Sequence, residues 1–422
     1  MEKRSNSQLI KQLNEIRILN YIRDEGQVSR IDLAKRSKMS KVAVSEIVNR
    51  LVKSGYVIEI GKGESTKRGG KRPTLLKLNP NNRYVIGIDV KRHFTKVGIA
   101  NIESNILEQE YFEYEVGISV DQWTSQTFDK IDLLLTKHNV VLDKLIGIGI
   151  AIPGVVNYEK GELRFADTLP NWGNTPIVPE FLRRYKVPVV MENDVNTLAL
   201  AENLIGAGKD EANLICIWIG AGIGAGIIVD NHLIRGQTGN AGEIGYLELG
   251  HKIVNTQLLK YLYSNQHFFG EILSEEHFLE VLNANLSGST AVRGCEKVKS
   301  TLAKIVQLGD EGNTQVQDIL DEYAYLLAVL CNDLFKTINP NLVILSGTII
   351  ENSMYLLKKV RQMVKQQMMK IPFQSSSIVI GKLGEEGFLK GAVSLALNII
   401  FEPPLRKSPS LSQYQLQKQL YT

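Results

Sequence analysis

The 422-residue sequence has few cysteines and no long apolar run. Cys216, Cys295 and Cys331 are far apart and form neither a CxxC pair nor a disulfide framework, so we expect them to be reduced core residues. No stretch of about eighteen uninterrupted apolar residues is present, and residues 1–14 are polar and charged, without an apolar leader. These absences predict a cytoplasmic protein with no membrane partner.

Charge is unevenly distributed along the chain. Residues 1–83 hold 19 Lys and Arg against 8 Asp and Glu, a net charge of +11. Residues 84–422 hold 30 against 37, a net charge of −7. We call the basic part of the chain, within residues 1–83, the head and the rest of the chain the body. A basic head on an acidic body suggests that the head binds a polyanion.

The first 80 residues have the pattern of a winged helix-turn-helix. A helical apolar repeat ends at Gly26, and a short second helix is expected from Ser29 or Arg30 to Ser37. A third helix follows over residues 41–54, and two short strands, 55–60 and 74–78, come after it. The N-terminal side of the third helix carries small or basic residues, which fit a major groove.

The loop between the two strands, residues 61–73, combines glycines with several cations. Such a loop is slim enough to reach phosphates or a minor groove, although a charged loop by itself is more often only solvated. The preceding helices favour DNA contact. We therefore predict that a double-stranded DNA operator is contacted by Ser40, Lys41, Ala43, Ser45, Arg50, Lys67, Arg68, Gly69, Gly70, Lys71 and Arg72.

After a polar joint at Asn79 to Arg83, the pattern changes to that of an α/β body. Its beginning, three strands, a helix and a buried strand that ends in Pro153-Gly154, is typical of an actin-like or sugar-kinase-like lobe. The predicted domains are the head over 1–80, a first lobe over 84–205, a second lobe over 206–400 with a closing C-terminal helix, and a polar tail over 401–422.

Asn193 and Asp194 follow an apolar run and open a helical pattern, so we expect them at the end of a strand and the start of a helix. A carboxylate beside a carboxamide can hydrogen-bond the hydroxyls of a polyol, and the carboxylate can also act as a general base. Either residue can equally serve only as a helix cap. From this segment alone the two interpretations are even.

Several segments in a fixed order resemble the ROK family, which contains repressors, open reading frames and sugar kinases. They are Ala151-Ile152-Pro153-Gly154, Leu169-Pro170-Asn171-Trp172, Glu192-Asn193-Asp194-Val195-Asn196, the glycines of 220–226, Gly239-Asn240-Ala241-Gly242-Glu243-Ile244-Gly245 and Asn339-Pro340. With its winged head, the chain looks like the repressor branch and has the layout of xylose repressors.

The resemblance implies a sugar site between two lobes, a homodimer, and a kinase ancestry. It places sugar ligands at Gly154, Asn171, Asn193, Asp194, Glu243 and Tyr246. Trp172 is either a face for a pyranose ring or a core anchor. Glu243 is either a pocket carboxylate or a surface one, and its glycine-rich setting favours the pocket.

The departures from the family pattern argue against an enzyme. Kinases of the family have a glycine-rich turn after the first strand. This chain has Asp89-Val90-Lys91-Arg92-His93-Phe94 there, and the bulky side chains of Arg92, His93 and Phe94 should block phosphates. Ala221 replaces the hydroxyl residue of the second phosphate motif, so the glycines around it are expected to serve packing. We therefore predict no ATP site and no catalytic residue.

A structural zinc ion is not expected either. Tyr246 stands where many members have His, the family's cysteine cluster is missing, and His251 alone cannot build a four-ligand site. The sequence thus predicts a sugar-responsive repressor of carbohydrate genes, with xylose as one candidate effector. The alternatives are a sugar kinase with an accessory DNA-binding head and a repressor controlled by a protein partner.

Overall fold

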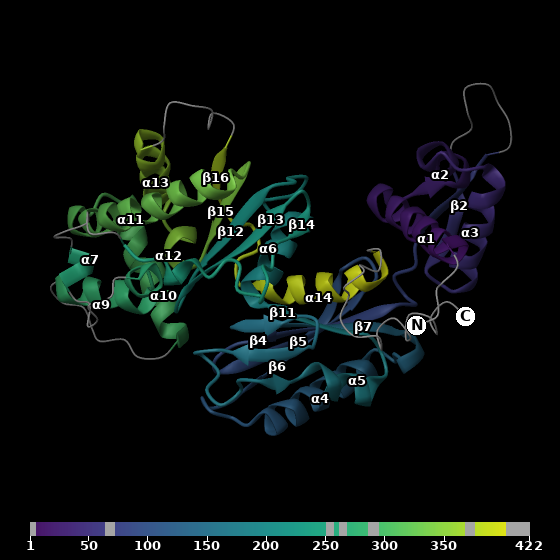
Figure 1. Ribbon diagram of the computed structural model, residues 1–422, viewed down its shortest axis with the longest axis horizontal. Coiled ribbons are helices and arrows are strands. Elements are labelled where there is room, and N and C mark those ends of the chain that lie inside the picture. Colours follow the sequence, from purple (N-terminus) through teal and green to yellow (C-terminus); the bar gives the residue numbers. More distant parts are fainter. Residues whose placement is uncertain are drawn as a thin grey trace. The chain divides into compact units, whose positions relative to one another are not determined.

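The computed structural model describes residues 6–63, 72–249, 257–260, 268–285, 295–367 and 376–401 (Figure 1). The described chain divides into two compact units. The first contains the residues up to Asp194 and those from Leu389 onward, and the second is Val195–Phe388. The predicted tail, apart from Phe401, lies outside the described residues.

The head, in the first unit, consists of three helices and a three-stranded sheet of order β1-β3-β2. Ser29 caps the second helix by accepting from the amide of Asp32, and Ser40 caps the third by accepting from the amide of Ala43. This confirms the predicted winged helix-turn-helix. Its elements are α1 Asn6–Glu25, β1 Val28–Ser29, α2 Arg30–Ser37, α3 Lys41–Lys53, β2 Val57–Lys62 and β3 Thr74–Leu78.

The head shares a hydrophobic core with the rest of the first unit. Buried residues of its three helices belong to one cluster with Val393, Leu397 and Phe401 near the C-terminal end of the described chain. Asn20 of α1 donates a hydrogen bond to the carbonyl of Phe401 at 2.7 Å, and the guanidinium of Arg23 lies 4.4 Å from the Phe401 ring centroid.

The joint at Asn79 to Arg83 is also held by contacts. Asn82 Nδ2 donates to the carbonyl of Gly55 at 3.3 Å, and Arg83 Nη2 donates to the carbonyl of Ser54 at 2.5 Å. The Arg83 guanidinium lies over the buried ring of Tyr56, 4.9 Å from its centroid. The joint therefore connects directly to the end of the third head helix.

The large sheet of the first unit has the order β11-β7-β4-β5-β6. The three strands β4, β5 and β6 form an antiparallel meander, and β4, β7 and β11 run parallel, as the sequence pattern predicted for the first lobe. The elements are β4 Tyr84–Val90, β5 Phe94–Asn101, β6 Ile106–Glu113, α4 Val120–Lys137, η1 Leu142–Lys144, β7 Leu145–Ile152, β8 Val155–Asn157, β9 Glu162–Phe165, β10 Thr175–Pro176, α5 Val178–Tyr185, β11 Val189–Asn193 and α6 Asp194–Ile205.

Helices cover both faces of this sheet, with α4 and α5 on one face and α14, Glu386–Phe401, on the other (Figure 1). Helix α14 approaches so closely that a Cβ on Gly149 of β7 would lie 2.0 Å from the Ala392 carbonyl oxygen. The sequence assigns this helix to the second lobe, whereas its residues from Leu389 onward pack in the first unit. The glycines of the sheet make that packing possible.

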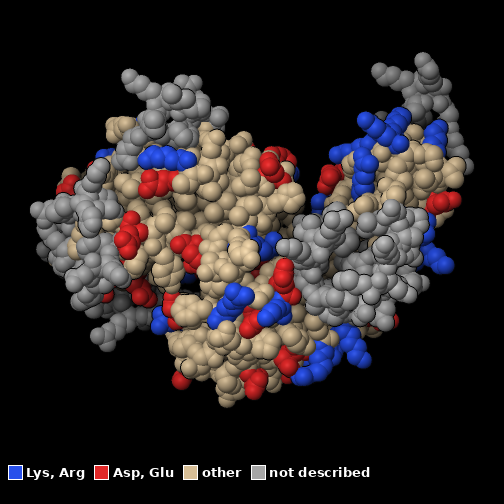
Figure 2. Space-filling model, in the orientation of Figure 1, with Lys and Arg blue, Asp and Glu red and all other residues tan. Residues whose placement is uncertain are grey.

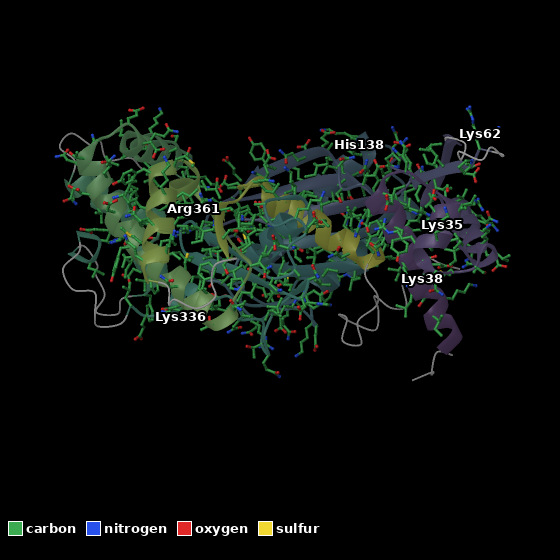
Figure 3. All side chains as sticks on the ribbon, turned by 90° about the horizontal axis from the view of Figure 1, so that it is seen from above. Lys35, Lys38, Lys62, His138, Lys336 and Arg361 are labelled. Atoms are coloured by element: carbon green, nitrogen blue, oxygen red, sulfur yellow. The ribbon has the colours of Figure 1, made fainter. Side chains whose placement is uncertain are left out.

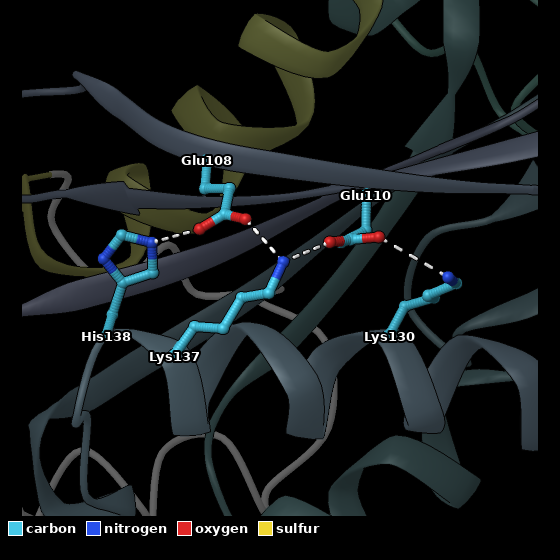
Figure 4. A network of polar contacts seen from close by, with 5 residues as sticks. All are labelled: Glu108, Glu110, Lys130, Lys137 and His138. Atoms are coloured by element: carbon cyan, nitrogen blue, oxygen red, sulfur yellow. Dashed lines mark hydrogen bonds and ion pairs between the residues drawn. The ribbon is translucent and has the colours of Figure 1, made fainter.

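An exposed ionic network joins α4 to strand β6 (Figure 4). Lys137 Nζ lies 2.7 Å from Glu108 and 2.6 Å from Glu110, and it lowers the pKa of both carboxyls. His138 contacts the carboxylate of Glu108, and Lys130 contacts that of Glu110. Because the network is solvated, its role is to align the helix with the strand rather than to add much stability.

The second unit repeats the sheet pattern, with the order β14-β13-β12-β15-β16. Strands β12 and β13 are antiparallel, and β12, β15 and β16 run parallel. The other elements are largely helical: β12 Leu214–Ile219, β13 Ile223–Val229, β14 His232–Leu233, η2 Ile244–Tyr246, α7 Gln257–Lys260, α8 Phe269–Ile272, α9 Glu275–Asn285, α10 Cys295–Asp310, α11 Thr314–Ile338, β15 Leu342–Ser346, α12 Thr348–Glu351, α13 Met354–Gln367 and β16 Ser377–Ile380.

Candidate functional site

The predicted polar pair lies where two parallel strands end. Strand β11 ends at Asn193 and pairs in register with β7, which ends at Ile152. Asn193 Nδ2 donates to the carbonyl of Gly154 at 3.0 Å, which fixes the carboxamide at this edge. Gly154 has φ +100°, and a Cβ there would lie 2.2 Å from the Phe165 carbonyl oxygen, so only glycine fits.

Asp194 is the first residue of α6, where a helix N-terminus favours a negative charge. Its Oδ2 lies 3.3 Å from Lys91 Nζ, which also lies 3.1 Å from Oδ1 of Asp89. Asp89 is 1% exposed, and this burial raises the pKa of its carboxyl, while Lys91 lowers it. One lysine thus bridges two carboxylates that come from the end of β4 and the start of α6.

Lys91 begins the turn between β4 and β5, and its backbone amide donates to the Phe94 carbonyl at 2.9 Å. Tyr114 donates its hydroxyl proton to the Lys91 carbonyl at 2.5 Å, which holds the turn from the other side. From the sequence, this turn was predicted only to block phosphate binding. The spacing of Lys91 two residues after Asp89 was the available signal for the ion pair.

Asn171 is exposed and has φ +71°, next to Trp172. Trp172 is 1% exposed, donates its indole NH to the Ile118 carbonyl at 2.8 Å, and packs 5.0 Å from the Trp123 ring. Of the two predicted roles for Trp172, the structure shows the core anchor. The exposed Asn171 is therefore held in place by the buried side chain of its neighbour Trp172.

Glu243 and Tyr246 belong to the second unit. Gly242, with φ +94°, packs so closely on β13 that a Cβ would lie 1.8 Å from the Ala225 carbonyl oxygen. This contact positions Glu243, which is half-buried. Tyr246 is 58% exposed, and its ring lies 6.2 Å from that of Phe268.

The glycines between Gly220 and Gly226 include two with a packing role. A Cβ on Gly226 would lie 2.3 Å from Ala199 Cβ of α6, and one on Gly224 would lie 3.1 Å from Val195. This confirms the predicted packing role for Gly224 and Gly226. Gly222, by contrast, faces open space, so its lack of a side chain is not required by packing.

The structure offers no cluster for zinc among the residues that it describes. In that part of the chain, no group of three His, Cys, Asp or Glu side chains could hold a metal ion. His251 lies outside the described residues. Cys216 and Cys331 are buried free thiols, as predicted, and burial is the main cause that raises the pKa of each.

The head presents several cations to solvent. Figure 2 shows Lys and Arg gathered on the visible face of the head, and Figure 3 shows that Lys35, Lys38 and Lys62 belong to the head. All three are exposed, as are Lys41 and Arg72 of the predicted DNA-contact set. Lys67, Arg68, Gly69, Gly70 and Lys71 lie outside the described residues.

The remaining predicted DNA contacts have local partners. The hydroxyl of Ser40 caps α3, and Ala43 and Ser45 are half-buried. Arg50 Nε lies 2.6 Å from Glu15 Oε1, so this arginine joins α3 to α1. Its contribution to DNA binding stays a prediction.

The head and the body together define the class of protein. A winged helix-turn-helix is followed by an α/β body whose two sheets have the same strand order when one of them is read in reverse. The sequence pattern of winged helix-turn-helix DNA-binding domains matches residues 12–58. That of the ROK family matches residues 85–399. The chain belongs to the ROK family.

Similar proteins match most of the length of this chain. The chain is 29% identical to the xylose repressor of Caldicellulosiruptor bescii, over 94% of this chain and 99% of the relative. It is 26% identical to the N-acetylglucosamine repressor of Escherichia coli O6:H1, over 86% and 87% of the two chains. A crystal structure of a ROK family transcriptional regulator, a homologue of the Escherichia coli Mlc protein, has a TM-score of 0.78 at 21% identity and covers 98% of this chain and 99% of that one. Among the described residues, no helix is both long and apolar enough to cross a membrane.

Proposed function

We propose that this protein is a sugar-responsive transcriptional repressor of carbohydrate genes. A winged head with exposed cations supports binding to an operator, and a strand-end Asn-Asp pair in the body supports recognition of hydroxyl groups. The observation that carries the proposal is that one chain contains both the DNA-binding head and this polar pair. Its relatives are named xylose and N-acetylglucosamine repressors. A DNA operator and a small sugar are the implied partners, and the protein acts in the cytoplasm.

The sugar ligands that we propose are Gly154, Asn171, Asn193, Asp194, Glu243 and Tyr246. Asn193 and Asp194 are held at a sheet edge by a carbonyl and by a lysine, so they can read hydroxyls without reorganising. Glu243 is positioned in the second unit by the close contact of its neighbour Gly242 with β13. Xylose and N-acetylglucosamine are the first effectors to test, because two relatives are named for them.

We propose that the body transfers no phosphoryl group. Phosphoryl transfer needs cradled phosphates and a carboxylate that can accept the proton of the attacking hydroxyl. Here the Asp194 carboxylate contacts the ammonium of Lys91, and the β4–β5 turn carries Lys91, Arg92 and His93 in place of glycines. We accordingly expect neither ATP nor zinc as a cofactor.

The regulatory mechanism requires two arrangements of the head that differ in affinity for sugar. In a homodimer, two heads would bind the halves of a two-fold-related operator. A sugar releases DNA only if it prefers the arrangement that does not bind DNA. The joint at Asn79 to Arg83 is the proposed lever, because Arg83 contacts the carbonyl at the end of α3.

A thermal-shift screen followed by operator titration tests the proposal. A panel of pentoses and hexoses, including xylose and N-acetylglucosamine, should contain a sugar that raises the melting temperature by mass action. That sugar should change operator affinity, and no ATP-dependent turnover should appear in a coupled assay. Operator affinity unchanged by every sugar would refute the sugar response, and turnover lost in Asp194→Asn would instead identify a kinase.

A further inference from the structure

Val42 is the most exposed large apolar side chain of the described residues, with 69% of its surface accessible. It is the second residue of α3, directly after Lys41. The buried face of this helix consists of Val44, Ile47, Val48 and Leu51. Val42 therefore contributes nothing to the core of the head.

Local structure does not favour a valine at this position. A β-branched side chain loses rotamer freedom in a helix, and an exposed one gains no packing in return. Single exposed apolar residues are common on protein surfaces, so exposure by itself decides nothing. The surroundings of Val42 on the helix give the second observation.

Residues that follow at helical spacing place Val42 on a polar face. Ser45, Glu46 and Asn49 share that side of α3, because residues three, four and seven positions apart lie on one helix face. Glu46 and Asn49 are exposed. Val42 is the apolar member of this face, at its N-terminal end.

Polar contacts tie this face of α3 to α2 and to strand β2. Arg30 Nη1 donates to Asn49 Oδ1 at 2.8 Å, and its Nη2 lies 2.9 Å from Glu59 Oε1 on β2. The guanidinium thus joins α2, α3 and β2. The exposed side of α3 is therefore pre-oriented as a reading surface.

We propose that Val42 is a specificity-determining residue that contacts the C5 methyl group of a thymine in the major groove. The N-terminal residues of a recognition helix are those that reach base edges, and the thymine methyl is the one apolar group displayed there. The inference rests on the proposed DNA-binding function. It adds a thymine to each operator half-site, opposite the start of α3.

Selection of binding duplexes from a random library, with the full-length protein, supplies the site for the test. Each thymine of the selected site is then replaced in turn by uracil, which lacks only the C5 methyl. Fluorescence anisotropy should show one position in each half-site where uracil weakens binding about fourfold, the effect of burying one methyl-sized group. In Val42→Ser, uracil and thymine at that position should bind with affinities within about twofold of each other.

Ile10→Ser is the matched control, since Ile10 is a 56% exposed apolar residue of α1. It should keep the thymine preference of the unaltered protein. Failure to enrich any duplex would refute the proposed DNA-binding function and this inference with it. A selected site at which Val42→Ser keeps the full preference for thymine would refute the inference alone.

Discussion

Lys91 Nζ lies 3.3 Å from Asp194 Oδ2, so the carboxylate proposed to read the sugar has a built-in cationic partner. The same ammonium lies 3.1 Å from Asp89. A strand end and a helix start are thereby joined through one side chain. This arrangement fixes the orientation of the Asp194 carboxylate.

Asp194→Asn should weaken sugar binding by about tenfold or more, because a hydrogen bond to a charged group contributes ~1.5–3 kcal/mol. Isothermal titration with the sugar found in the thermal-shift screen gives the affinity. Asp129→Asn removes an exposed carboxylate of α4 and should leave that affinity unchanged. An affinity that survives in Asp194→Asn would remove this residue from the proposed site.

Asp89→Asn should change how stability depends on pH. Burial raises the pKa of Asp89 above its ordinary 3.8, and Lys91 offsets this only in part. As pH rises above 3.8, the unfolded chain loses the Asp89 proton before the folded protein does. The contribution of Asp89 to the free energy of unfolding therefore decreases with pH up to the folded pKa of Asp89 and stays constant above it. The Asn variant lacks this loss.

Urea titrations at a series of pH values measure the effect. The free energy of unfolding of Asp89→Asn, relative to that of the unaltered protein, should increase as pH rises from 3.8 through the folded pKa, and then stay level. A difference that shrinks with increasing pH would mean that the native environment favours the charged form of Asp89.

Gly149→Ala should destabilise the first unit by ~1–3 kcal/mol, because the added methyl overpacks the contact between β7 and α14. A Cβ at this position would lie 2.0 Å from the carbonyl oxygen of Ala392, which is backbone and cannot rotate away. Gly222→Ala is the control, since a Cβ there meets nothing within 4 Å. Equal denaturation midpoints for the two variants would contradict the close packing of α14.

The basic loop of residues 61–73, the wing of the head, should act through phosphate contacts. Replacing both Arg68 and Arg72 by Ala should reduce the magnitude of the slope of log operator affinity against log salt concentration by about two, if each arginine neutralises one phosphate. Sugar affinity should stay the same. Lys160→Ala with Arg164→Ala removes two exposed cations of the body and is the matched control. An unaltered salt slope in the wing variant would exclude the wing from the interface.

Local patterns predicted much of the fold. The sequence predicted a helix from Ser29 or Arg30 to Ser37 and another over residues 41–54, and the structure forms them as α2 and α3, whereas the capping roles of Ser29 and Ser40 come from the structure. The alternation of apolar strands and the Pro153-Gly154 turn likewise predicted the first sheet. These features depend on neighbouring residues, so a single sequence contains them.

Other features depend on contacts between distant residues. The placement of α14 on the first sheet requires Gly87 and Gly149 to meet Leu389 and Ala392, and no local pattern states that pairing. The Lys91 bridge to Asp194 is long-range as well. In addition, Trp172 had two plausible roles, which only its burial could distinguish.

Asn20→Ala should weaken the coupling between sugar and DNA. Asn20 Nδ2 donates to the Phe401 carbonyl at 2.7 Å, which is one of the contacts between α1 of the head and the end of α14. If the head changes position when sugar binds, this contact differs between the two states, and such contacts alter coupling by ~0.5–2 kcal/mol. We expect the sugar-induced change in operator affinity to fall by about twofold or more. Asn14→Ala on the same helix is the control. A full sugar response in Asn20→Ala, measured by anisotropy with and without sugar, would show that the signal reaches the head without this contact.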